Sequence, residues 1–119
     1  MMAWWFSGPA LLHDNPFVWR PPTNVYETEE GLLLQVEVAG LAPDDFRVTL
    51  RPSRLTVAGV RRALPGLTGS PACLQVEIAG GSFRSDIDLP WPVEAEAVSA
   101  AYRLGFILVE IRRPTGGVE

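Results

Sequence analysis

The sequence is poor in the residue types that carry most protein chemistry. Its 119 residues include one Cys and one His, and all ten basic side chains are Arg because Lys is absent. A single Cys excludes an internal disulfide framework, and a single His excludes a Cys/His zinc site. The formal net charge of -4 disfavours nucleic-acid binding, since that requires clustered basic residues.

Long hydrophobic runs are also absent. No stretch approaches the roughly 18 apolar residues of a transmembrane helix, so we expect no membrane span. The apolar N-terminus lacks a basic region and is interrupted by Pro9, Asp14 and Pro16, which argues against a signal peptide. The expected compartment is therefore the reducing cytoplasm.

Motifs for catalysis or cofactor binding are missing as well. His13 has no second His or Cys nearby, and Cys73 has no basic partner in its segment. Acidic pairs such as Asp44-Asp45 lie at turns or on the polar sides of strands, where solvation explains them. No glycine-rich phosphate loop, G-x-S-x-G motif or metal-ligand spacing occurs. We therefore expect no enzymatic activity, no cofactor and no metal.

Glycine, proline and alternating apolar residues dominate what is present. The length suits one domain, and 11 Gly with 11 Pro indicate many turns and little long helix. After Pro21-Pro22 the period-2 pattern of β-strands recurs. The Gly80-Gly81 pair predicts a hairpin between two of these strands. The expected fold is an all-β, antiparallel β-sandwich, with strands at residues 25–27, 32–38, 46–51, 54–60, 73–78, 83–89 and 106–112.

Residues 94–104 depart from this pattern. They are rich in Glu and Ala, so their composition predicts a short helix that ends before Gly105.

The first 20 residues form an aromatic segment without a clear period. One interpretation is an arm that packs its aromatic side chains on its own domain. The other is an exposed arm that self-associates or binds other proteins, because exposed aromatic clusters mark such contacts. The segment contains Trp4, Trp5, Phe6, Phe17 and Trp19.

Five short motifs, in order between Pro21 and Pro114, resemble the α-crystallin domain of the small heat-shock proteins. Residues 22–28 are similar to its opening, residues 36–41 to its next strand and turn, and residues 54–61 to its Leu-Thr-Ile-x-Gly-x-Arg strand. Residues 81–90 resemble its Gly-x-Phe…Leu-Pro segment. The A-x-x-x-n-G-x-L signature is matched by Ala100, Gly105, Phe106 and Ile107.

The resemblance implies a fold and a function. It implies an immunoglobulin-like β-sandwich over residues 21–114, a flexible N-terminal arm over residues 1–20 and a short tail over residues 115–119. It also replaces the helix at residues 94–104 with a strand over residues 98–103. The implied function is that of an ATP-independent holdase chaperone, which binds partly unfolded client proteins and prevents their aggregation.

Three surfaces follow from the resemblance. Clients would contact the arm through Trp4, Trp5, Phe6, Leu11, Leu12, Phe17 and Trp19. A loop over residues 61–72 would exchange between subunits of a dimer, with Arg61, Arg62, Leu64 and Leu67 at its contacts. A groove between residues 46–50 and 83–89 would dock the I-x-I motif of a neighbouring tail, on Val48, Leu50, Ile87 and Leu89.

Two departures from the family pattern shape the expected assembly. No I-x-I motif follows Arg113, so a homodimer or small homo-oligomer is expected instead of a large cage. Ser85 stands where the family often has Arg. The missing tail motif also raises an alternative function, an adaptor or co-chaperone of the CS-domain type that binds one specific partner protein.

Overall fold

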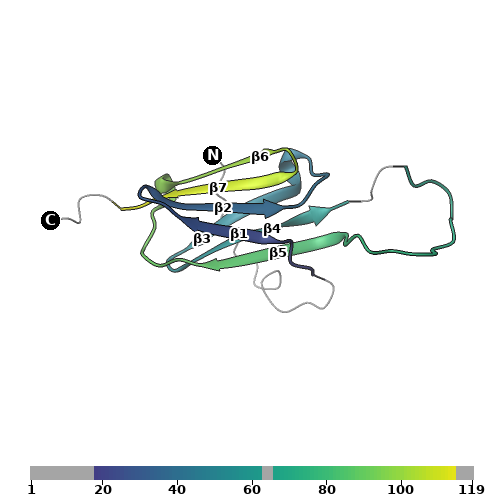
Figure 1. The fold of residues 1–119 in the computed structure, drawn as a ribbon, viewed down its shortest axis with the longest axis horizontal. Coiled ribbons are helices and arrows are strands. Elements are labelled where there is room, and N and C mark those ends of the chain that lie inside the picture. Colours follow the sequence, from purple (N-terminus) through teal and green to yellow (C-terminus); the bar gives the residue numbers. More distant parts are fainter. Residues whose placement is uncertain (1–17, 63–65, 115–119) are drawn as a thin grey trace.

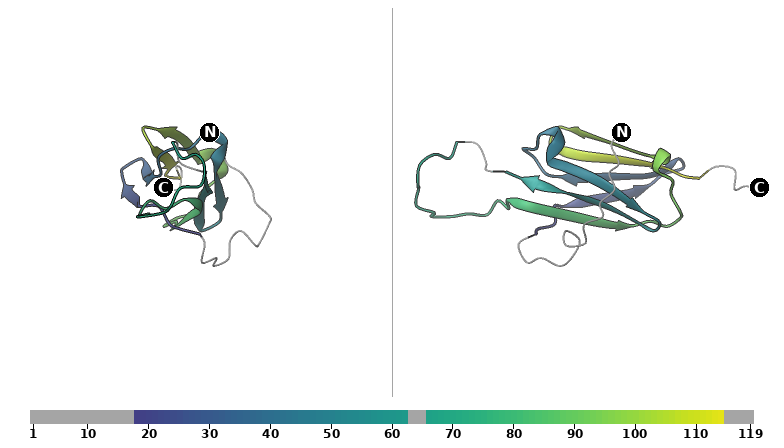
Figure 2. Two further views of the ribbon diagram at one scale, coloured as in Figure 1. Left: turned by 90° about the vertical axis from the view of Figure 1, so that its right-hand side faces the viewer. Right: turned by 180° about the vertical axis from the view of Figure 1, so that it is seen from behind.

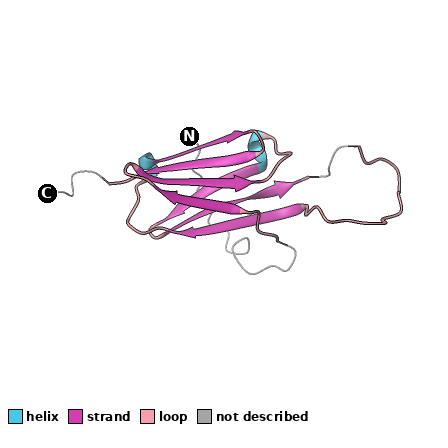
Figure 3. Ribbon diagram, in the orientation of Figure 1, coloured by secondary structure: helices cyan, strands magenta, loops and turns pink. Residues whose placement is uncertain are grey.

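The computed structural model describes residues 18–62 and 66–114, and the regular elements of this part are strands with two 3-10 turns (Figures 1 and 3). No α-helix occurs among the described residues, and the predicted all-β fold class is confirmed. The 3-10 turns are η2 (Pro43–Asp45) and η3 (Ala95–Ala97). The strands are β1 (Thr23–Glu27), β2 (Gly31–Glu37), β3 (Phe46–Arg51), β4 (Arg54–Arg61), β5 (Gly81–Asp88), β6 (Val98–Arg103) and β7 (Phe106–Arg112).

The strands form two antiparallel sheets that pack as a sandwich (Figures 1 and 2). The four-stranded sheet has the order β1-β2-β7-β6, and the three-stranded sheet has the order β3-β4-β5. The strands that border the two sheets are therefore β1 and β6 in one layer and β3 and β5 in the other. This arrangement confirms the predicted β-sandwich.

The core lies between the sheets and is built from the alternating apolar residues. On β2 and just after it, Leu34, Val36 and Val38 are fully buried, as the period-2 pattern predicts. In the opposite sheet Leu50 pairs with Leu55, which in turn pairs with Ile87, so one row of side chains crosses all three strands. Burying each such side chain contributes about 1.5–3 kcal/mol, and this burial fixes which face of each strand points inward.

Residues 94–104 form η3 and then β6, so the helix that their composition predicts is wrong. The strand that the resemblance implies over residues 98–103 is confirmed. Val98 is buried in the core, and its strand pairs along its whole length with β7, where Val98 lies opposite Ile111. Helix propensity differs by less than about 0.7 kcal/mol per ordinary residue, so burial and strand pairing outweigh it.

The predicted strand at residues 73–78 and its Gly80-Gly81 hairpin are also wrong. β5 begins at Gly81 and pairs with β4, and the two strands are joined by the long connection over residues 62–80. Within that connection the described residues, 66–80, contain no strand. A sequence shows that a segment can pair, but the neighbour is chosen by the tertiary fold, and here β4 is the neighbour of β5.

Gly59 on β4 is required by a close approach between strands. A Cβ at this position would lie 2.2 Å from the carbonyl oxygen of Asp45 and 2.7 Å from Cζ of Phe83. Gly59 pairs with Phe46 on one side and Phe83 on the other, so its bare backbone makes room for two aromatic neighbours. The glycine of the Leu-Thr-Ile-x-Gly-x-Arg motif thus has a packing reason.

Candidate functional site

The predicted groove between residues 46–50 and 83–89 does not exist. β4 lies between β3 and β5, so these two strands are the opposite borders of one sheet and not the walls of a cleft. The four residues assigned to the groove point into the core. Their exposed fractions are 0% for Val48, 3% for Leu50, 7% for Ile87 and 9% for Leu89. Their alternation marked the buried face of each strand, but it carried no information on the order of the strands.

On one side of the sandwich the border strands β3 and β6 meet through aromatic side chains. The rings of Phe46 and Tyr102 have centroids 6.0 Å apart. The Tyr102 hydroxyl donates to the carbonyl oxygen of Val38 at 2.8 Å and accepts from the amide of Leu41 at 3.2 Å. Tyr102 therefore ties β6 to the turn after β2. Sequence reasoning missed this role, and the one available signal was the alternation within residues 98–103.

The four signature residues lie together around the β6–β7 hairpin. Ala100 packs against the core from β6, and Ile107 on β7 is fully buried. Gly105 forms the turn with φ of +83°, and its carbonyl oxygen accepts from the amide of Val38 at 2.9 Å. The first residue of β7, Phe106, pairs with Arg103. The signature is thus a structural one that shapes the hairpin and fixes it to the end of β2.

On the other side of the sandwich, β1 and β5 are joined by a partly buried pair of hydroxyl groups. Thr23 Oγ1 and Ser85 Oγ are 2.8 Å apart, and Ser85 is fully buried. Because Thr23 donates its proton to the carbonyl oxygen of Pro21 at 3.0 Å, Ser85 is the donor to Thr23. Ser85, at the position where the family often has Arg, therefore makes a short neutral link between the sheets.

Trp19 is anchored on β5 and is half-buried. Its amide donates to the carbonyl oxygen of Ser82 at 3.1 Å, and its own carbonyl oxygen accepts from the amide of Arg84 at 2.9 Å. Its ring lies 5.8 Å from that of Phe83. Trp19 therefore belongs to the sandwich surface, and its role as a client contact stays a prediction. The other six predicted client contacts, Trp4, Trp5, Phe6, Leu11, Leu12 and Phe17, lie outside the described residues.

The connection between β4 and β5 presents a row of exposed apolar side chains. It projects beyond the end of the sandwich (Figure 1), and Leu74, Val76 and Ile78 are exposed by 95%, 73% and 62%. Of the predicted loop contacts, Leu67 is also exposed, whereas Arg61 is the last residue of β4. Arg62 donates from Nε to Oδ1 of Asp45 at 3.0 Å. Leu64 lies outside the described residues.

The carboxyl groups of Asp86 and Asp45 have lowered pKa values. Partial burial alone would raise the pKa of Asp86, but hydrogen bonds from Arg84 and Thr56 outweigh it and lower the pKa below its ordinary value of 3.8. The backbone amide of Ala42, followed by Arg62, lowers the pKa of Asp45. A lowered pKa makes each carboxylate a weaker base, and each is paired with an Arg, so neither is suited to be a general base.

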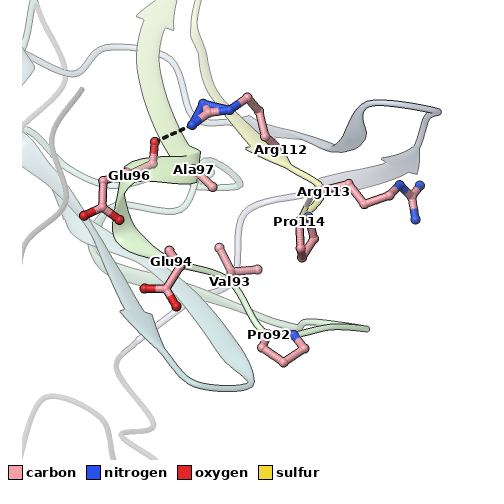
Figure 4. A pocket seen from close by; sticks show the side chains of 8 residues that line it. All are labelled: Pro92, Val93, Glu94, Glu96, Ala97, Arg112, Arg113 and Pro114. Atoms are coloured by element: carbon pink, nitrogen blue, oxygen red, sulfur yellow. Dashed lines mark hydrogen bonds between the residues drawn. The ribbon is translucent and has the colours of Figure 1, made fainter. Parts of the chain in front are cut away.

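A surface pocket of about 560 Å³ lies where β7 ends, next to η3 (Figure 4). Arg112 contributes to its lining and donates to the carbonyl oxygen of Glu96 at 2.9 Å. Arg113 extends away from Glu96 and donates to the carbonyl oxygen of Thr28 at 2.7 Å. Both guanidinium groups therefore have partners within the chain, and their contacts fasten the end of β7.

The described part of the chain offers neither a cluster of metal ligands nor a membrane-spanning helix. No cluster of three or more His, Cys, Asp or Glu side chains in residues 18–62 and 66–114 could hold a metal ion. In the same part of the chain no helix is long and apolar enough to cross a membrane.

Comparison with solved structures shows which fold this is. Heat shock protein 16.0 of Schizosaccharomyces pombe superposes with a TM-score of 0.70 at 22% identity, covering 79% of this chain and 86% of that one. A small heat-shock protein of Xylella fastidiosa superposes with a TM-score of 0.71 at 21% identity, covering 85% of this chain and 92% of that one. The sandwich is thus the one found in small heat-shock proteins.

Comparison of sequences identifies the family. Small heat shock protein C4 of Rickettsia felis is 28% identical over 106 residues, which cover 89% of this chain and 63% of that protein. The mitochondrial heat shock 22 kDa protein of Pisum sativum is 28% identical over 105 residues, which cover 85% of this chain and 48% of that protein. The chain thus spans about half to two thirds of the length of these relatives. The Hsp20/alpha crystallin family matches residues 24–119, and the chain belongs to this family, that of the small heat-shock proteins.

Proposed function

We propose that this small heat-shock protein is an ATP-independent holdase that binds partly unfolded proteins and keeps them from aggregating. The family supports a chaperone role. The observation that carries the finer statement is the exposed apolar row of Leu74, Val76 and Ile78, on a domain that buries the alternating apolar residues of β2. Contiguous exposed apolar residues mark sites of protein association. The family also supports the expectation that the protein is not an enzyme.

We further propose that the chain forms a homodimer by strand exchange, in which residues 73–78 of each copy pair with β1 of the other. β1 borders its sheet, and its Val25 and Tyr26 are 46% and 50% exposed. An unpaired strand edge offers backbone donors and acceptors to an extended segment, and alternating side chains provide the apolar contact. In this proposal the exchanged part is residues 73–78, which directly follow the loop over residues 61–72 that the resemblance implied.

The client-binding role of Trp4, Trp5, Phe6, Leu11, Leu12 and Phe17 stays a prediction from the sequence. The same holds for Trp19, the seventh residue of the set, which is half-buried on Phe83. The alternative of a CS-type co-chaperone with one partner gains no support from the family match. The cytoplasm also stays a prediction.

Client protection tests the holdase proposal directly. A thermolabile enzyme is heated with an equimolar amount of the chain in the absence of ATP, and its aggregation is followed by light scattering. The full chain should suppress scattering. A variant that begins at Val18 keeps the exposed apolar row and the Trp19 anchor, so protection that survives in it comes from the row and protection that it loses comes from residues 1–17. Scattering that is unchanged by the full chain would overturn the proposal. One dominant stoichiometric partner in a pull-down would favour the co-chaperone.

Strand exchange is tested by Val76→Lys, which places a charge in the apolar row. Sedimentation velocity should show dimers for the unmodified chain and monomers for the variant, because a buried unpaired Lys opposes the contact. Glu77→Lys is the matched control, since it adds the same side chain at the adjacent exposed position on the opposite face of the segment. Val76→Lys chains that remain dimeric would place the subunit contact elsewhere.

A further inference from the structure

Arg61 closes the base of the exposed connection between β4 and β5. It is the last residue of β4 and pairs with Gly81, the first residue of β5. Its Nε donates to the carbonyl oxygen of Ala79 at 3.1 Å, and its Nη2 donates to the same oxygen. Its Nη1 donates to the carbonyl oxygen of Ala39 at 3.3 Å. One guanidinium group thus fastens the last residues of the connection to the turn after β2.

The same guanidinium group contacts the segment that leads into the sandwich from the N-terminus. Its Cζ atom lies 4.7 Å from the centroid of the Trp19 ring, within the range of a cation–π contact. Trp19 in turn reaches the base of the connection directly, because its Nε1 donates to the carbonyl oxygen of Gly81 at 3.4 Å. Trp19, Arg61 and the backbone of residues 79–81 therefore form one contiguous cluster.

We propose that Trp19 and Arg61 act as a latch that sets the direction in which the connection over residues 62–80 leaves the sandwich. Arg61 is a positioning residue, and it acts through the carbonyl oxygen of Ala79. Trp19 holds the guanidinium group through the cation–π contact with its ring. Displacement of Trp19 should therefore change the direction of residues 73–78, although Trp19 and these residues are far apart in the sequence.

The contacts of the latch do not depend on strand exchange, but its effect on dimer formation rests on the proposed strand exchange. A segment that already points toward the partner loses less conformational freedom on pairing, so an intact latch favours the dimer. Coupling between two sites is reciprocal, so dimer formation should also strengthen the anchoring of Trp19. The latch thus connects Trp19, which directly follows most of the residues predicted to bind clients, with the segment proposed to bind a second copy.

The latch can be tested on monomers, because Cys73 lies on the exposed connection. Cys73 is the single Cys of the chain and is exposed, so a nitroxide spin label attached there reports the motion of the connection. The measurement uses the full chain carrying Val76→Lys, which removes exchange. Arg61→Met, Trp19→Leu or both are then introduced into this Val76→Lys chain. Arg51→Met is the control, since Arg51 lies on the opposite end of β3 from the connection.

Arg61→Met and Trp19→Leu should each narrow the lines of the label's electron paramagnetic resonance spectrum, because the connection then moves more freely. Arg51→Met should leave the spectrum unchanged. The double variant should narrow the spectrum no more than the single variant with the larger effect, because both substitutions break the same contact. Unchanged spectra in the two single variants, or two effects that simply add, would overturn the latch. If Arg61→Met does not fold, Trp19→Leu alone decides, because its leucine retains an apolar contact with Phe83.

The same substitutions in the chain without Val76→Lys test the consequence. The dimer dissociation constant should rise about fivefold or more in Arg61→Met and Trp19→Leu, and it should not change in Arg51→Met. A constant within twofold of the original in both variants would overturn the coupling to dimer formation. If Val76→Lys leaves the dimer intact, the strand exchange fails, while the spin-label result still decides the latch.

Discussion

The strands of the sandwich and the segment over residues 73–78 share one sequence pattern and have opposite surroundings. In β2 the alternating apolar residues Leu32, Leu34 and Val36 are buried, whereas in the segment Leu74, Val76 and Ile78 face solvent. The difference is the neighbour. β2 lies between β1 and β7, while residues 73–78 have no strand partner among the described residues. A period-2 pattern therefore indicates that a segment can pair as a strand. Residues 73–78 have this pattern and do not pair with any described strand of the chain.

The largest difference between the two regions should be in their contribution to folding. Phe83→Ala should lower the free energy of unfolding by about 3–5 kcal/mol, because its ring is fully buried in the core. Leu74→Ala should change it by less than about 0.5 kcal/mol. Urea unfolding at a protein concentration low enough for monomers measures both. Similar losses would mean that the connection packs on the sandwich of its own chain.

Gly59 in the sandwich and Gly80 in the connection differ in how closely other atoms pack against the backbone. Gly59→Ala should destabilise the chain by about 1–3 kcal/mol, since its Cβ would collide with backbone atoms and with Phe83. Gly80→Ala is the matched control in the connection, because the nearest atom to its Cβ would be the carbonyl oxygen of Arg61, 3.9 Å away. Thermal unfolding of both variants checks the contrast. A neutral Gly59→Ala would show that β4 can shift.

Acid should weaken the sandwich through Asp86. Its pKa is lower in the folded chain than the ordinary value of 3.8, so the paired carboxylate stabilises the fold above about pH 4. This contribution is lost as the pH falls through the folded-state pKa. Solvent screens the pair, so we expect about 1 kcal/mol or less. Unfolding between pH 7 and pH 3 should show a smaller acid-induced loss in Asp86→Asn, and an equal loss would assign it to other carboxyl groups.

The smallest expected effect is a gain at the β6–β7 turn. Leu104 has φ of +55° and is exposed, and this left-handed conformation favours Asn over a branched side chain. Leu104→Asn should therefore stabilise the chain by about 0.5 kcal/mol. Leu67→Asn replaces another exposed leucine, one without a positive φ, and should have no effect on thermal unfolding. Equal shifts in the two variants would reflect surface polarity and not turn geometry.

The core was predictable because alternation is a local property. Residues 32–38 pointed four side chains to one face, and all four are buried. Residues 94–104 misled because composition reports helix propensity, whereas the burial of Val98 and pairing with β7 decided the outcome. The family motifs corrected this error, since they carry the result of tertiary packing in related chains.

The binding surfaces were less predictable because they depend on which strands are neighbours. The groove assigned to Val48, Leu50, Ile87 and Leu89 required β3 and β5 to face each other, and the insertion of β4 between them buries all four side chains. Tyr102 was not singled out, and Arg61 was assigned to a contact between subunits and not to the contacts that it makes within the chain. Their partners, Ala79, Ala39 and Val38, are backbone carbonyl groups, and a carbonyl group leaves no mark in a sequence.

The sequence by itself determined the class of fold, the inward face of most strands and, through short motifs, the family. Each of these depends on residues that are near one another in the chain. Only the tertiary structure decided the strand order, the placement of residues 73–78 in an exposed connection and the contact between Trp19 and Arg61. These depend on which surfaces meet after the chain folds, and side chains that are distant in the sequence come together because burial of the core leaves one arrangement of the two sheets.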